Sequence, residues 1–321
     1  MTKEYLKLIE AEIKNNKFGT EPKSLYEPIR YIMGLGGKRL RPLLTMLSYS
    51  LYKKDARKIV SYATAVETFH NFTLLHDDIM DKAPLRRGKA TVHKKWNVNT
   101  AILSGDVMLV KVYNQFTSLD EKKLKAVLKL FNTCAAEVCE GQQWDMEFET
   151  KLKVTEAHYI NMIRLKTAVL LGFSLELGAL LADAPKEEIK ALKEFGINIG
   201  IGFQLKDDLL DVYGDKNKFG KQVGGDIISN KKTFLLIKAV ENAKGKNKRE
   251  LALWLSAKKF KKQEKIKAVT SLYDAIGVQQ LTEKEIENYF KKGYAALENV
   301  SSVKKKEHLL AFTNDLIMRQ S

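Results

Sequence analysis

The sequence predicts an all-α protein, and three observations point to that class. Residues that favour helices, such as Leu, Lys, Ala and Glu, are abundant. Only five prolines occur and none follows Pro185, so the C-terminal part lacks strong helix breakers. Apolar residues recur with helical spacing through most of the chain. No linker rich in Pro, Gly or Ser divides the sequence, which therefore predicts a single domain over residues 1–321.

The same periodicity predicts the elements in chain order. We expect helices at 3–16, 24–33, 42–53, 56–81, 99–118, 121–149, 155–182, 187–212, 232–244, 248–257, 263–276, 282–298 and 304–318. Two long irregular segments, 82–98 and 213–231, each follow an acidic helix end and contain glycine and basic residues. Long loops of this kind inside a domain are often part of an active site.

The chain is strongly basic, with a formal net charge of +16. That balance suits a nucleic acid, a membrane surface or a polyanionic substrate, but lysine runs such as 258–262 are typical of a solvated surface. No nucleic-acid-binding signature is present, so we expect no nucleic-acid partner. The first 16 residues resemble an amphipathic helix rather than a signal peptide, and no apolar run approaches the roughly 20 residues of a membrane span. We expect a cytoplasmic protein without a stable membrane anchor.

One acidic pattern occurs twice, each time at the end of a predicted helix. It gives six carboxylates, at Asp77, Asp78, Asp81, Asp207, Asp208 and Asp211. The outer carboxylates of each copy are four residues apart and share a helix face. Negative charge near a helix C-terminus is unfavourable unless a cation neutralises it. Since Mg²⁺ binds through carboxylates and substrate phosphates, the two motifs predict a magnesium–diphosphate site.

The residues that precede each motif extend the polar face. His70 lies seven residues before Asp77, and Gln204 lies three before Asp207. The neighbouring residues are apolar, for example Phe69 and Phe203. A polar mouth above an apolar shaft suits a substrate with a charged head and a hydrocarbon tail.

Basic residues accompany these motifs and predict contacts to phosphate. Guanidinium groups pair with phosphate oxygens in a bidentate way, and a glycine turn before a helix offers free backbone N–H groups. Thr167 lies beside one of the lysines, inside an apolar helix. The candidate cations are Lys38, Arg41, Arg86, Arg87, Lys166, Lys221 and Lys231.

These segments resemble the trans-type isoprenyl diphosphate synthases, or polyprenyl synthetases. GGKRLRP, HNFTLLHDDIMD, LRRGKATVH, GQQWD, LKTA, GFQLKDDLLD and FGKQVGGDI occur in that family's order between residues 36 and 233. The resemblance implies the isoprenoid synthase fold, about a dozen mostly antiparallel helices around a central cavity, and a homodimer. It also implies a head-to-tail condensation of isopentenyl diphosphate with dimethylallyl, geranyl or farnesyl diphosphate, with three Mg²⁺ ions bound beside the substrate.

The resemblance also implies a role for each matching residue. Lys38, Arg41, His70 and Arg87 would bind the diphosphate of isopentenyl diphosphate. Asp77, Asp81 and Asp207 would coordinate Mg²⁺ directly, and Asp78 and Asp211 would act mainly through water or hydrogen bonds. The allylic diphosphate would be bound by Arg86, Lys166, Lys221 and, with less support because Lys232 is adjacent, Lys231. Thr167 and Gln204 would position the substrate near the reacting carbons.

Residues just before the first acidic motif set product length in that family. Phe72 lies five residues before Asp77 and Thr73 four before. One large residue at these two places is similar to the geranylgeranyl type, whereas two aromatic residues would indicate a farnesyl product. We therefore expect a C20 product, with a C15 product or a longer chain as alternatives.

Three other readings remain open but receive less support. A terpene cyclase also uses an Asp-rich motif, but its second metal motif differs and it lacks a second diphosphate site. A carboxylate-bridged di-iron bundle needs two ExxH patterns, and only Glu67–His70 is found, so Glu67 is expected to be structural. A regulatory subunit would have damaged acidic motifs, and both are intact.

Overall fold

The computed structural model describes residues 1–214, 224–301 and 303–317, which divide into two compact units. Unit 1 comprises Met1–Thr133, Phe173–Lys193 and Val300–Leu310. Unit 2 comprises Cys134–Gly172, Glu194–Asn299 and Ala311–Ser321. The single domain over 1–321 stays a prediction.

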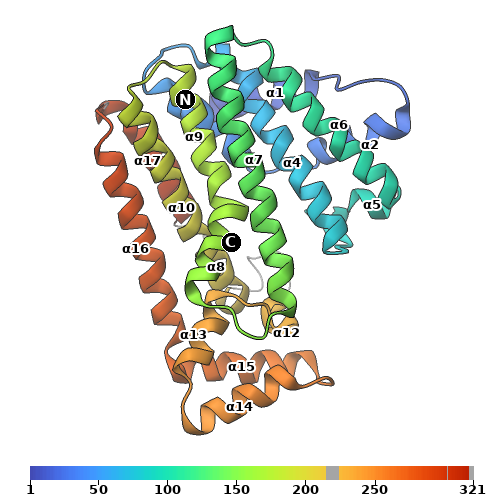
Figure 1. Ribbon diagram of the computed structural model, residues 1–321, viewed down its shortest axis with the longest axis vertical. Coiled ribbons are helices and arrows are strands. Elements are labelled where there is room, and N and C mark those ends of the chain that lie inside the picture. The colour runs from blue at the N-terminus through green and yellow to red at the C-terminus, as the bar shows by residue number, and fades with distance from the viewer. Residues whose placement is uncertain (215–223, 302, 318–321) are drawn as a thin grey trace. The chain divides into compact units, whose positions relative to one another are not determined.

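The elements follow one another along the chain as the colours of Figure 1 show. They are α1 (Thr2–Asn15), α2 (Lys23–Gly34), α3 (Leu40–Ser50), η1 (Ala56–Ile59), α4 (Val60–Met80), β1 (Leu85–Arg86), β2 (Lys89–Ala90), α5 (Val92–Lys95), α6 (Val98–Phe116), α7 (Glu121–Thr150), α8 (Glu156–Ile163), η2 (Arg164–Ala168), α9 (Val169–Leu181), α10 (Lys186–Tyr213), α12 (Gly225–Ser229), α13 (Phe234–Asn242), α14 (Gly245–Ser256), α15 (Lys262–Ile276), α16 (Val278–Glu298) and α17 (Val303–Ile317). The all-α class is confirmed, because β1 and β2 are the only strands of the described residues. None of the helices in the described ranges is both long and apolar enough to span a bilayer.

Helix α4 is the central element of unit 1, packed against α1, α2, α3, α5 and α6. Its buried Phe69 meets Phe131 with ring centroids 5.1 Å apart, and Phe116 and Phe173 lie against the same ring at 5.4 and 5.9 Å. Aromatic pairs at these distances add to the stabilisation from apolar burial. This cluster holds the helix whose C-terminal end carries the first acidic motif.

A short hairpin interrupts the irregular segment 82–98. Strands β1 and β2 pair antiparallel, with Leu85 opposite Ala90. The two turn residues, Arg87 and Gly88, both have positive φ, at 51° and 73°. A two-residue loop with this backbone is a type I′ turn, whose twist matches that of paired strands. Strands of two residues are too short to give an alternating pattern, so the sequence did not indicate them.

The helix expected at 155–182 is wrong in one respect, because a π-helical segment divides it. Helix α8 ends at Ile163, the π-helical η2 covers Arg164–Ala168, and α9 follows. A Cβ atom at Gly141 of α7 would lie 2.2 Å from the backbone nitrogen of Lys166. The absence of that side chain lets α7 approach the wider turn. Such segments occur often at functional sites, and this one contains Lys166 and Thr167.

Candidate active site

The first acidic motif lies at the C-terminal end of α4, in unit 1. Asp78 is only 2% exposed; its Oδ2 accepts a hydrogen bond of 2.8 Å from Nε of Arg86, and its Oδ1 forms an ion pair with Nη2 of the same side chain at 2.8 Å. Burial raises the pKa of Asp78 and the Arg86 cation opposes that change. Asp77 is half-buried, with Oδ2 3.7 Å from Arg86 Nη2, and Asp81 is exposed. Arg86 therefore holds the middle carboxylate, and the outer two remain nearer to solvent.

The second acidic motif lies near the C-terminal end of α10, in unit 2, and repeats this arrangement. Asp208 is 5% exposed and accepts bonds from the Tyr159 hydroxyl and, at 3.1 Å, from Nε2 of Gln204. Burial, and next the charge of Asp226, raise the pKa of Asp208 to about 7. Asp207 and Asp211 are half-buried. In both motifs the outer carboxylates are thus more accessible than the middle one, as expected for residues four apart on one helix face.

Three basic residues expected to meet a diphosphate lie close to the glycine turn of unit 1. Arg41 Nη1 lies 3.0 Å from Nε2 of His70. Burial, and next the Arg41 charge, lower the pKa of His70, so its ring is neutral near pH 7. Arg87 donates to the carbonyl of Gly36, and a Cβ atom at Gly37 would lie 2.8 Å from Arg87 Nη2. A side chain at this position would therefore displace the guanidinium group.

Arg39 is a residue of this turn that the sequence did not single out. Its φ of 46° is left-handed, and it forms the N-cap of α3 between Lys38, which is exposed, and Arg41. The guanidinium group is buried and pairs with Glu67 at 3.0 Å and Glu10 at 2.7 Å. The structural role expected for Glu67 is thereby confirmed. An unusual backbone conformation persists only where its surroundings hold it, and here two carboxylates do so.

Unit 2 holds a second group of predicted site residues. Lys166 Nζ lies 2.6 Å from Oδ2 of Asp145. Burial raises the pKa of Asp145, but the charges of Lys166 and Lys231 outweigh it, so the pKa is lowered. Thr167 donates to Gln204 Oε1 at 3.2 Å. A polar chain therefore runs from Thr167 through Gln204 to the buried carboxylate of the second motif.

The structure separates two adjacent lysines that the sequence left ambiguous. The charge of Lys231 acts on both Asp145 and Asp208. Lys232 instead lines a separate pocket and donates to the backbone carbonyl of Asn230 at 3.4 Å. Of the two lysines, Lys231 is therefore the one whose charge acts on the second acidic motif. Lys221 lies outside the described residues.

Three polar residues of this region were missed as site residues. Asp145 ends the GQQWD segment, and Asp226 belongs to the GGDI segment, where its backbone N–H donates to Asp211 Oδ2 at 2.9 Å. Both could have been found as acidic residues beside a motif. Tyr159 gave no signal, because a tyrosine within a helical pattern is equally typical of a core.

The two candidate chain-length residues lie on α4, below the first motif. The Phe72 ring packs against His76 and Phe69, with centroids 4.7 and 5.7 Å apart. The Thr73 hydroxyl donates to the backbone carbonyl of His70 at 2.8 Å. Both side chains are half-buried.

Comparison with known proteins agrees with this arrangement. The polyprenyl synthetase family model matches residues 22–273. A short chain isoprenyl diphosphate synthase of Methanocaldococcus jannaschii is 42% identical over 85% of this chain and 83% of its own length. A geranylgeranyl pyrophosphate synthase of Geoglobus acetivorans is 45% identical over 74% of this chain and 75% of its own. A crystal structure of a geranylgeranyl pyrophosphate synthase superposes with a TM-score of 0.95 at 45% identity, covering 100% of this chain and 99% of that one. The chain belongs to the polyprenyl synthetase family.

Proposed function

We propose that this protein is a trans-prenyltransferase that condenses isopentenyl diphosphate with allylic diphosphates, releases diphosphate and forms a short all-trans product. The observation that carries the proposal is the repeated acidic motif, in which both copies bury the middle aspartate and leave the outer pair more accessible. Cationic side chains accompany each copy, and the family and the named relatives support the same chemistry.

The outer aspartates of the two motifs suit Mg²⁺, which prefers hard oxygen ligands. Within the described ranges, no group of three His, Cys, Asp or Glu side chains is placed so that it could hold a metal ion by itself. This fits an ion that is bound by one or two carboxylates and completed by substrate phosphates. When bound, the Mg²⁺ ions would stabilise the negative charge that develops on the departing diphosphate. We propose Asp77, Asp81, Asp207 and Asp211 as the residues that hold them.

Asp78 and Asp208 have a different part in this proposal, because each is buried and bound to the protein. Asp78 fixes the guanidinium group of Arg86, and Asp208 is held by Tyr159 and Gln204. Each middle aspartate then orients neighbouring groups rather than binding the ion directly.

The basic residues of unit 1 would hold isopentenyl diphosphate. Arg41, Arg87 and Lys38 supply positive charge, and the neutral ring of His70 offers a hydrogen bond to a phosphate oxygen. In unit 2, Lys166 and Lys231 would neutralise diphosphate charge, and in unit 1 Arg86 would do so. The apolar residues around these groups exclude water, which would otherwise quench an allylic cation.

A C20 product is the best-supported length. Phe72 is the one large residue of the pair before the first motif, and geranylgeranyl synthases are among the similar proteins. A homodimer is also supported, because α6 exposes several large apolar side chains. These are Val98, Ile102, Leu103 and Val110, between 41% and 57% exposed.

The test is incubation with isopentenyl diphosphate, each allylic starter and Mg²⁺, followed by product mass determination. Asp77→Ala and Asp207→Ala should each lower turnover by about 100-fold or more while circular dichroism is unchanged. Glu283→Ala, on the exposed face of α16, is the matched control and should behave like the wild type. Near-normal turnover by both Asp variants with saturating Mg²⁺ would refute the proposal.

A further inference from the structure

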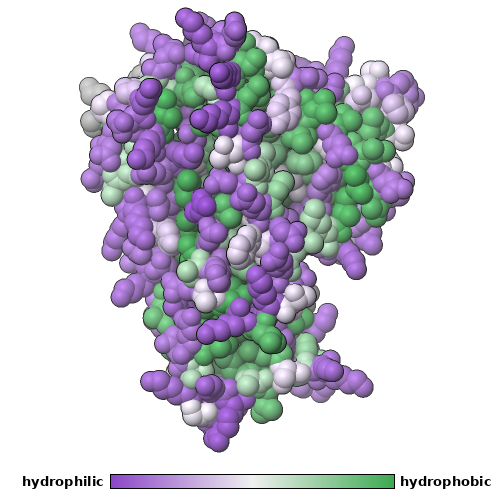
Figure 2. All heavy atoms as spheres, in the orientation of Figure 1, coloured by the Kyte–Doolittle hydropathy of each residue, from purple (hydrophilic) through white to green (hydrophobic). Residues whose placement is uncertain are grey.

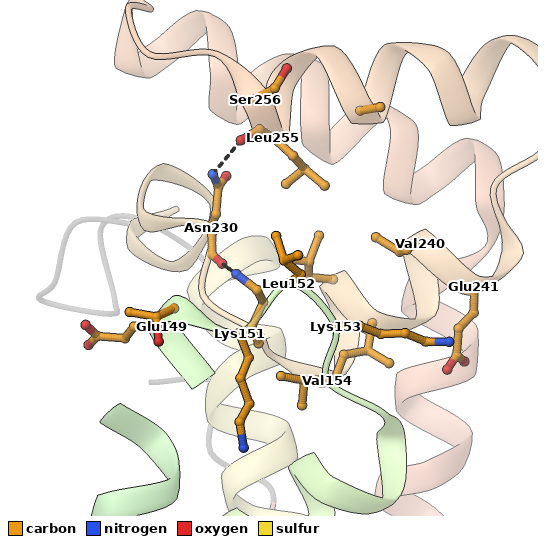
Figure 3. Close-up of a pocket in the computed structure, with 15 residues that line it drawn as sticks. Glu149, Lys151, Leu152, Lys153, Val154, Asn230, Val240, Glu241, Leu255 and Ser256 are labelled. Carbon is orange, nitrogen blue, oxygen red and sulfur yellow. Dashed lines mark hydrogen bonds between the residues drawn. The ribbon is translucent and has the colours of Figure 1, made fainter. Parts of the chain in front are cut away.

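A pocket lies on unit 2 among α13, α14 and the segment that joins α7 to α8. Its volume is about 500 Å³, and Leu152, Val154, Leu236, Ile237 and Leu255 give it a mainly apolar lining. Figure 3 shows these elements converging around it, with Asn230 bound to the Leu255 carbonyl at one edge. None of its lining residues belongs to the site described above, so the pocket is a separate feature.

Large apolar side chains are exposed around this pocket. Leu152 is fully exposed at its rim, Val240 is 51% exposed, and Leu253, on α14, is 69% exposed. Figure 2 shows hydrophobic residues gathered over α13 and α14, with hydrophilic residues on either side. Exposed apolar side chains that cluster, rather than occur singly, indicate an interaction surface.

Positive charge is concentrated on the same elements. Residues 244–267 contain ten Lys or Arg and two Glu, a net charge of +8, which is half of the chain's +16. The cations occur before and at the start of α14 and again directly after its end, so they flank its exposed apolar residues. The described exposed cations are Lys244, Lys246, Lys248, Arg249, Lys258, Lys259, Lys261, Lys262 and Lys267.

Helix stability does not explain this distribution. The start of α14 has Lys244 as N-cap and no acidic residue in its first turn. Cations at a helix N-terminus oppose the helix dipole and weaken the helix. Only two exposed ion pairs offset them, Lys246–Glu250 at 3.6 Å and Lys261–Glu264 at 3.1 Å, among the residues that the structure describes. Most of the positive charge of residues 244–267 therefore faces solvent.

We propose that this region, the α14 surface, is a reversible docking surface for an anionic lipid bilayer. We define the α14 surface as Leu152, Val240 and Leu253 together with the exposed cations of 244–267. A bilayer offers anionic headgroups to the lysines and an acyl region to the leucines, and peripheral helices combine both contacts. The apolar pocket gives space for part of a lipid chain. A nucleic acid would use the cations but would leave exposed aliphatic side chains without a partner.

The apolar half of the proposal is tested with vesicles of equimolar phosphatidylglycerol and phosphatidylcholine, in a flotation assay at low salt. The wild type should bind these vesicles, and the variant Leu152→Ser/Leu253→Ser should bind at least tenfold less, because a buried leucine contributes about tenfold or more. Both leucines are exposed, so the substitutions leave the core intact. The matched control is Leu281→Ser on α16, an exposed leucine that is not one of the residues of the α14 surface, which should bind normally.

The charged half is tested by replacing the four lysines after α14 with Gln. Each cation near an anionic membrane contributes about fivefold to binding, so the quadruple variant should also bind at least tenfold less. Binding should fall at high salt and on vesicles of phosphatidylcholine alone. The variant replaces Lys258, Lys259, Lys261 and Lys262, and its control replaces the exposed Lys14, Lys17, Lys186 and Lys190.

Three results would overturn the proposal. The first is failure of the wild type to float with anionic vesicles. The second is an equal loss of binding in the control variants, which would show that binding does not depend on the α14 surface in particular. The third is loss with the lysine variant but not with the leucine variant, which would indicate a purely electrostatic contact without insertion of the apolar side chains. Turnover with the soluble starters should be unchanged in both surface variants, which separates this proposal from the catalytic one.

Discussion

The buried ion pair between Arg39 and Glu67 gives the sharpest prediction for stability. The Glu67→Gln substitution keeps the shape of the side chain and its oxygen 3.0 Å from Arg39 Nη1, but removes its negative charge. Both side chains of this pair are 2% exposed. The Arg39 cation would remain buried with one fewer counter-charge. Breaking a buried pair by removing one partner typically costs about 3–5 kcal/mol.

The chain supplies a matched control on the same arginine. Glu10 lies closer to Arg39, at 2.7 Å, but its side chain is 51% exposed. Solvent screens such a pair, and exposed pairs contribute about 0–1 kcal/mol. Glu10→Gln should therefore lower the stability by less than about 1 kcal/mol. Distance alone predicts the opposite order, so the comparison isolates burial as the cause.

The Arg39–Glu10 pair partly compensates the buried cation, so we expect the lower end of the range, about 3 kcal/mol, for Glu67→Gln. The assay is equilibrium urea unfolding followed by circular dichroism, with the midpoint and slope compared among wild type and both variants. Since Arg39 lies between Lys38 and Arg41, Glu67→Gln should also raise KM for isopentenyl diphosphate more than it lowers kcat. Equal stability losses for the two variants, or a loss below about 1 kcal/mol for Glu67→Gln, would refute the reasoning.

Three further predictions concern other residues of the site. Tyr159→Phe removes a buried hydrogen-bond donor to Asp208 and should lower the free energy of unfolding by about 1–3 kcal/mol. Tyr213→Phe, which removes an exposed hydrogen bond to Asp274, should lower it by less. Equal losses of the two variants in urea unfolding would contradict this. Burial, and then neighbouring arginines, lower the pKa of His70, so the folded state excludes a proton that the unfolded state binds below about pH 6.5. The contribution of His70 to the free energy of unfolding should be complete above that pH and should fall below it, by up to about 1.4 kcal/mol per pH unit. His70→Gln should therefore flatten the plot of unfolding free energy against pH between pH 7 and 5. An unchanged slope would exclude His70 as its source. Phe72→Ala should lengthen the products seen by mass spectrometry. An unchanged product profile would reject Phe72 as the residue that limits product length.

Most of the helical fold follows from the sequence, because helices are set by local spacing. The two acidic motifs could be placed at helix ends for the same reason. The hairpin at Arg87–Gly88 and the π-helical segment at Lys166–Thr167 could not be predicted. Each of these features depends on one or two residues. So few residues do not alter the spacing of apolar side chains from which the helices were predicted.

Partnerships between distant residues were also beyond the sequence. Glu67 is 28 residues from Arg39, and Tyr159 is 49 residues from Asp208. Nothing local distinguishes these side chains from ordinary helix residues. Their roles follow from burial, which makes an unpaired polar group costly and so requires a partner.

Residue type and short-range spacing were sufficient to establish the fold class, the candidate carboxylates and cations, and the family to which they belong. The burial of Asp78 and Asp208, and the greater accessibility of their outer neighbours, became visible only in the folded chain. The same holds for Lys231, whose charge acts on the second motif, and for Lys232, which lines another pocket. In each case solvent exposure and electrostatic environment are set by packing between segments that are far apart in the chain.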